Sequence, residues 1–175
     1  VWDQNNNWAK LSGSNLSDLS NMVDTPTGHS DLAGLGFSVT NAIAVLNIGS
    51  FRTYSHKVNA HTAGTTTFAV DPVFKRKSSG NQFYFLEGKL EFLDVQNEWY
   101  FNDTTKELYF WGDTNAAIRG KVQDYAFNLT NCDDITISGI DFFATTVRFK
   151  NCDRAWVEKG DYNFPSCTKR MLGAE

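Results

Sequence analysis

The most informative stretch of the chain reads FNLTNCDDITI at residues 127–137, and it returns as VRFKNCDRAWV at residues 147–157. The two copies are offset by 20 residues, and their apolar residues occupy matching positions around the shared triplet Asn-Cys-Asp. A strand-turn-strand unit that returns at a short fixed period is typical of a β-solenoid, in which each coil stacks about 4.8 Å above the last. The repeat therefore predicts stacked coils within residues 116–175.

The shared triplet gives two expectations about these coils. Asn131 should lie beside Asn151, because an asparagine in a turn can hydrogen-bond to the same residue of the next coil. Cys132 and Cys152 should lie one above the other, and two thiols are favoured over a bridge because a free cysteine packs as a small hydrophobe. With Cys167 the cysteine count is odd, so at least one thiol stays free or pairs between molecules.

The residues before the repeat predict an antiparallel β domain over residues 39–115. Short apolar runs alternate there with turn residues, at 42–48, 52–60, 65–70, 82–85 and 89–93. A hairpin follows, in which two aromatic strands at 98–101 and 107–111 flank a turn-forming segment, and its rings favour cross-strand packing over a sugar-stacking platform. Residues 1–38 carry isolated apolar side chains, which predict an irregular lead-in with at most one short helix, at about 15–21.

Several of these stretches resemble a known family. They are YFLEGKLEFLD at residues 84–94, the two hairpin strands, and ITISGIDFF at residues 135–143. They are similar to segments of the right-handed parallel β-helix proteins of bacterial polysaccharide-degrading systems, many of which are glycoside hydrolases or lyases. In such proteins the first two segments belong to a small antiparallel β domain inserted between early coils, and the third opens the main helix.

The resemblance implies a piece of an extracellular or periplasmic protein that acts on, or holds, a polysaccharide. Proteins of this family are several times longer than 175 residues, and their catalytic carboxylates usually come from later coils. We therefore expect a fragment that is not catalytically complete, and no catalytic residue is assigned. The alternative is a structural or adhesive β-solenoid module, in which the aromatic hairpin and the stacked asparagines serve only the fold.

The second copy of the repeat carries the candidate substrate-binding residues Arg148, Lys150, Asp153 and Glu158. Polar and apolar residues alternate there, so some of these side chains should share the solvent face of one sheet, which could bind an acidic sugar. In lyase chemistry, Arg148 or Lys150 would neutralise the uronate carboxylate, with Glu158 near as the base that takes the α-proton. An ordinary solvated strand face is the simpler interpretation of the same residues.

Composition and charge argue against several kinds of partner. The chain has 16 Lys and Arg against 20 Asp and Glu, a net charge of −4, so no general positive field attracts nucleic acid. No apolar run approaches the roughly 20 residues that a membrane-spanning helix needs. The spacing of His56 and His61 predicts no metal site, and no cofactor is expected, although Asp133 and Asp134 could supply two oxygens to Ca²⁺.

The combined prediction is an all-β fold, in which an antiparallel β domain leads into the first coils of a right-handed parallel β-helix. A single β-sandwich or barrel is the alternative. A solenoid that ends after a few coils leaves an open edge, which pairs with another chain or needs a cap. We therefore expect self-association through that edge, with a polysaccharide as the other candidate partner.

Overall fold

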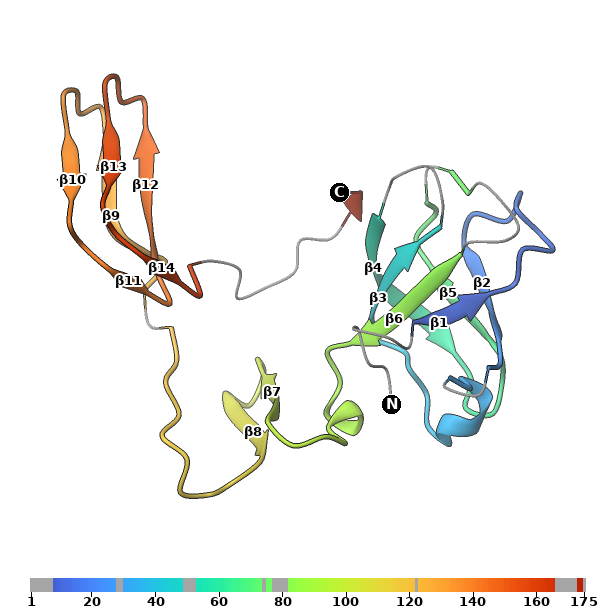
Figure 1. Ribbon diagram of the computed structural model, residues 1–175. Helices are drawn as coiled ribbons and strands as arrows, with labels where there is room; N and C mark the ends of the chain where they lie inside the picture. Colours follow the sequence, from blue (N-terminus) through green and yellow to red (C-terminus); the bar gives the residue numbers. More distant parts are fainter. Residues whose placement is uncertain are drawn as a thin grey trace. The chain divides into compact units, whose positions relative to one another are not determined.

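The computed structural model describes residues 8–27, 30–48, 53–73, 75–76, 82–121, 123–165 and 173–174. The chain forms two compact units, one of residues 1–114 together with 171–175, and one of residues 115–170. In the described ranges both consist of strands and irregular segments, with two short 3-10 turns and no α-helix (Figure 1). The all-β prediction is therefore confirmed.

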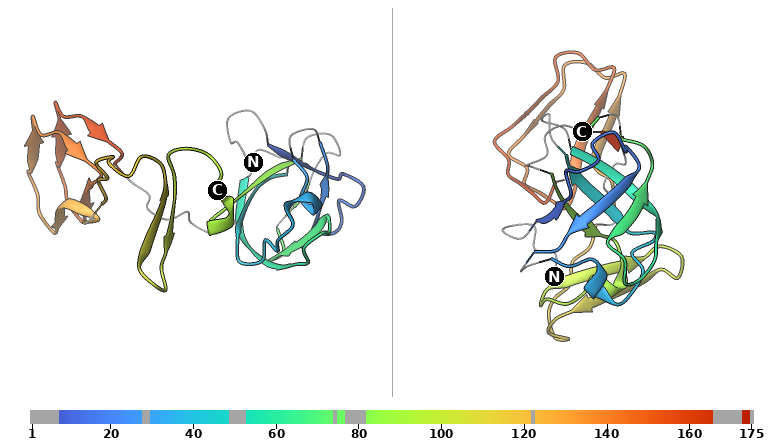
Figure 2. Two further views of the ribbon diagram at one scale, coloured as in Figure 1. Left: turned by 90° about the horizontal axis from the view of Figure 1, so that it is seen from below. Right: turned by 90° about the vertical axis from the view of Figure 1, so that its right-hand side faces the viewer.

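The first unit contains a closed barrel of six antiparallel strands. These are β1 (Ala9–Leu11), β2 (Asn21–Thr25), β3 (Ile43–Asn47), β4 (Thr53–His61), β5 (Thr67–Val70) and β6 (Phe83–Glu87). They pair in the order β4-β3-β6-β1-β2-β5, and β5 returns to β4 to close the sheet. Figure 2 shows this barrel from two further directions. A short strand, β15 (Gly173–Ala174), lies beside the first part of β4. The antiparallel prediction holds, and closure removes the exposed edges of an open sheet.

The barrel interior combines apolar side chains with one buried acid. Phe68 and Tyr84 are fully buried and pack ring to ring, with centroids 5.1 Å apart. The Tyr84 hydroxyl donates to the carboxylate of Asp24 at 2.9 Å, and the Leu32 N–H donates to the same carboxylate at 3.1 Å. Burial nevertheless raises the pKa of Asp24, because removal from water disfavours its charged form more than the two donors favour it.

Residues 8–27 differ from the expected irregular lead-in, because they supply β1 and β2 of the barrel. The helix expected at residues 15–21 is wrong, since this segment forms turns and ends in β2. Arg76 holds this segment in its turn conformation. The buried guanidinium donates at 3.1, 3.1 and 2.9 Å to the carbonyl oxygens of Ser12, Asn15 and Asp18. Carbonyls turned toward an arginine are not available to the hydrogen bonds of a helix.

After β6 the chain forms a short connection and then the aromatic hairpin. The strand expected at residues 89–93 is wrong: Leu90–Phe92 is a 3-10 turn, η2, and the Lys89 ammonium beside it donates to the Ser38 carbonyl at 2.8 Å. The predicted hairpin is confirmed, as β7 (Glu98–Asn102) and β8 (Glu107–Trp111) pair in antiparallel register.

The second unit contains two successive turns of chain, residues 125–144 and 145–164, which we call the first and the second turn. The first turn carries β9 (Tyr125–Thr130), β10 (Thr136–Ser138) and β11 (Phe142–Phe143), and the second carries β12 (Thr146–Lys150), β13 (Trp156–Glu158) and β14 (Tyr162–Asn163). Each strand pairs in parallel with its equivalent: β9 with β12, β10 with β13, and β11 with β14. Residues 20 apart lie opposite each other in β10 and β13, as the repeat predicts.

The backbone repeats as closely as the sequence does. Residues with φ between 53° and 71° recur at equivalent places in the two turns, at 131 and 151, 134 and 154, 139 and 159, and 144 and 164. Asparagine and glycine tolerate this left-handed conformation well, whereas Ala144 and Phe164 are strained in it. At Gly160 an added Cβ would lie 2.1 Å from the Ile140 carbonyl oxygen, so glycine is what allows the turns to approach there.

The shared Asn-Cys-Asp triplet lies where the two turns stack. Asn151 Nδ2 donates to Asn131 Oδ1 at 3.2 Å, which confirms the predicted asparagine pair. Cys132 and Cys152 are both half-buried. They are free thiols and form no disulfide bridge with each other. Cys167 lies outside the described residues.

Candidate functional site

A basic strip runs along the outer face of the β9 and β12 pair, and it consists of Tyr125, Arg148 and Lys150. Arg148 and Lys150 are exposed and alternate along β12 with half-buried Val147 and Phe149. The Arg148 guanidinium carbon lies over the Tyr125 ring, 5.6 Å from its centroid. Two of the predicted residues thus share one solvent face, with a ring that the sequence analysis did not include.

A groove adjoins this strip where the chain enters β9. It has a volume of about 420 Å³ and is lined by residues 119–121, 123, 126 and 143–145. The Arg119 guanidinium carbon lies over the Phe143 ring, 5.8 Å from its centroid. The Lys121 ammonium lies 3.7 Å from the Asp124 carboxylate. Ala126, which lines the groove, directly follows Tyr125, so the groove and the strip both lie at the start of β9.

Two arginines therefore lie over two aromatic rings in the second unit. A ring beneath a guanidinium holds it by cation–π attraction and leaves its in-plane N–H donors available. Those donors form two-point hydrogen bonds with carboxylates, and the rings offer apolar faces for C–H groups. The arrangement can hold an anionic ligand that also has apolar faces.

Asp153 and Glu158 do not belong to this surface. Asp153 lies in the turn that follows β12, and Glu158 lies on β13, which pairs in a different sheet from β12 (Figure 1). Glu158 accepts a hydrogen bond of 3.1 Å from the Ser138 hydroxyl and lies 3.4 Å from the Lys159 ammonium. Glu158 therefore lies on a different sheet from Arg148 and Lys150, whereas lyase chemistry would need a base beside those cations.

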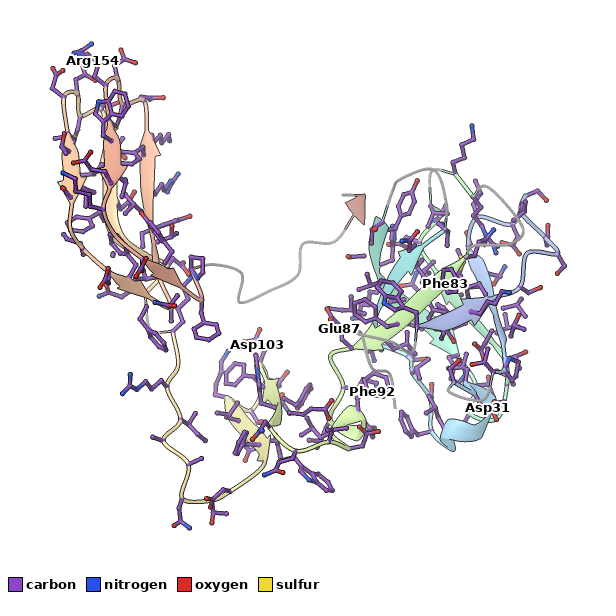
Figure 3. All side chains as sticks on the ribbon, viewed as in Figure 1. Asp31, Phe83, Glu87, Phe92, Asp103 and Arg154 are labelled. Atoms are coloured by element: carbon purple, nitrogen blue, oxygen red, sulfur yellow. The ribbon has the colours of Figure 1, made fainter. Side chains whose placement is uncertain are left out.

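The acidic pair considered for Ca²⁺ takes part in the stacking of the turns instead. Asp134 forms an ion pair with Arg154, whose label in Figure 3 marks the end of the second unit where the triplets stack. This contact lowers the pKa of the Asp134 carboxyl, and the carboxylate of Asp133 accepts the Asp153 N–H at 2.9 Å. Among the described residues, no group of three or more His, Cys, Asp or Glu side chains could hold a metal ion.

The aromatic hairpin presents rings to solvent on both of its faces. Trp99 is 63% exposed and lies opposite Phe110, whereas Trp111 is 55% exposed and lies opposite Glu98. Cross-strand packing therefore covers these rings only in part. The hairpin belongs to the first unit, and none of its residues lines the groove.

Sequence reasoning misses Arg119, Lys121 and Phe143. The two cations lie in an irregular segment before β9, and no apolar alternation marks them as part of the second unit. The repeat gives no signal for the two cations either. Extending the 20-residue offset backward aligns residues 119–124 with residues 139–144, and the two segments share no residue at any aligned position.

Comparisons with known proteins give no match: no family model, curated protein or solved structure is similar to this chain. In the ranges that the structure covers, no helix has the length and apolar character needed to cross a membrane.

Proposed function

We propose that the second unit binds an anionic polysaccharide along the groove and the basic strip. The observation that carries this proposal is the pair of arginine–ring contacts in the second unit, Arg119 over Phe143 and Arg148 over Tyr125. A polyuronate carries a carboxylate on each sugar ring and apolar C–H groups between them. Each arginine–ring pair would therefore offer it a two-point ionic contact and an apolar face.

The role we propose is to hold the polymer, without cleavage by this surface. The described lining of the groove consists of cations, one amide side chain, small residues and a ring, with no carboxylate. Hydrolysis of a glycosidic bond needs two carboxyl groups across that bond, and the described lining supplies neither. The cations at residues 119, 121, 148 and 150 instead suit the positioning of a charged chain.

We further propose that the two turns are coils of a right-handed parallel β-helix in an extracellular or periplasmic protein. Three parallel strand pairs and the left-handed residues at equivalent positions support this architecture. Stacked coils of this kind present extended outer faces, which fit linear polymers. The location is supported by the sequence resemblance alone.

Affinity electrophoresis in gels that contain polygalacturonate tests the binding proposal. The native chain should be retarded by polygalacturonate and not by dextran, a neutral glucan, because guanidinium–carboxylate contacts provide the affinity. The double variant Arg119→Gln/Arg148→Gln removes two charge-assisted contacts, each worth about 1 kcal/mol or more, and should bind at least about tenfold more weakly.

The matched control is Lys57→Gln/Lys106→Gln, which removes two positive charges from the first unit. It should bind polygalacturonate like the native chain. An equal loss in both double variants would show that binding follows net charge alone, and it would contradict the proposed site.

A further inference from the structure

The first turn of the stack presents an unpaired strand edge. In the described residues of the second unit, each strand has one neighbour only. The Trp156 N–H donates to the Ile135 carbonyl, and the Gly139 N–H donates to the Glu158 carbonyl. In parallel pairing this pattern leaves the main-chain groups of Thr136 and Ser138 directed away from β13. The outer edge of β10 therefore offers unused donors and acceptors to another strand.

Among the described residues, apolar side chains at both ends of the stack also remain partly exposed. Phe127, in the first turn, lies opposite Val147 and remains 36% exposed, while Tyr162, in the second, stacks on Phe142 and remains 39% exposed. In a longer stack such rings are covered by the next turn. An edge that combines free main-chain groups with partly exposed apolar side chains is a template for a further β-strand.

We propose that a second copy of this chain occupies this edge, with its β12 and β13 beside β9 and β10 of the first copy in the same parallel register. The side-chain contacts between the two turns support this partner, because they join equivalent residues 20 apart: Asn131 with Asn151, Asp134 with Arg154, and Ser138 with Glu158. In the proposed register Arg154 of one copy meets Asp134 of the next, so the two edges are complementary in charge. The same residue pairs would meet between chains, with their order along the stack reversed.

The proposed interface is limited to the edges of β9 and β10. Residues 119–121 and 123 line the groove beside Phe143, so the chain's own entry segment already lies near β11. Because the two edges that meet are different, the contact is head to tail and does not close at a dimer. Copies should therefore add one after another as the concentration rises.

Sedimentation velocity of the full chain, measured over a wide concentration series, tests the proposal. The weight-average mass of the native chain should rise at least about twofold with concentration, as an open head-to-tail contact requires. Thr136→Pro removes one of the two N–H groups that face the outer edge of β10, and its ring obstructs a strand paired there; proline is tolerated because no intrachain bond is lost. This variant should keep the native circular dichroism spectrum and remain a monomer.

Mixing the native chain with the Thr136→Pro variant gives a sharper test. The variant keeps an intact edge on its second turn, so it should bind the first turn of a native chain and shorten native assemblies. Hydrogen exchange of the Thr136 amide in the native chain, which should slow as concentration rises, gives a test that does not depend on the variant's folding. A native chain that stays monomeric throughout, or a Thr136→Pro variant that associates as strongly as the native chain, would overturn the proposal.

Discussion

Replacement of Arg76 by lysine should destabilise the barrel strongly. All five N–H groups of this guanidinium have acceptors within 3.1 Å: two bonds reach the Gln82 side chain, and three reach main-chain carbonyls of residues 12, 15 and 18. Lysine has three donors, so at least two bonds are lost. Hydrogen bonds to charged groups contribute about 1.5–3 kcal/mol each, which gives an expected loss of at least about 3 kcal/mol.

Urea unfolding followed by pulsed hydrogen exchange and mass spectrometry measures this loss on peptides from β3 and β6, separately from the second unit. Arg154→Lys is the matched control: it makes the same substitution on an exposed side chain of the second unit and should leave the barrel's free energy of unfolding unchanged. A loss below about 1 kcal/mol for Arg76→Lys, within the range of ordinary substitutions, would refute the view that this arginine fixes the lead-in to the barrel.

Two further substitutions test the buried acid and the close approach of the turns. Tyr84→Phe removes a donor from the buried carboxylate of Asp24 and should cost the barrel about 1–3 kcal/mol in the same unfolding experiment; a neutral result would mean that the hydroxyl has no net role. Gly160→Ala places a methyl group against the Ile140 carbonyl and should speed hydrogen exchange in β10 and β13. Gly120→Ala is the control, because an added Cβ meets open space there, and it should leave this exchange unchanged. Equal exchange in both variants would argue against the close stacking.

The stacking of the repeat could be predicted from the sequence because its signals are local. The triplets at 131–133 and 151–153 fix the turns, and apolar alternation on either side fixes the register. Closure of the barrel could not be predicted in this way. It depends on contacts between residues far apart in the chain, such as Tyr84 with Asp24 and Arg76 with Ser12, and the isolated apolar residues of the lead-in show no period.

Only part of the candidate site could be predicted from the sequence. Arg148 and Lys150 share a face because they alternate along one strand, which a sequence pattern shows directly. Asp153 and Glu158 lie elsewhere, because Asp153 belongs to the turn triplet and Glu158 to the strand beyond it, and alternation along one strand does not extend across that turn. The place of Arg119 over Phe143 depends on how the entry segment lies against the first turn, and no propensity of that irregular segment indicates it.

The most direct test of the account is an amide chemical-shift titration of the full chain with a galacturonate oligomer. We expect shifts confined to residues 119–126 and 143–150, which carry the groove and the basic strip. Shifts confined to the exposed aromatic hairpin at residues 98–111, or no shifts at concentrations that saturate polyuronate-binding proteins, would contradict it.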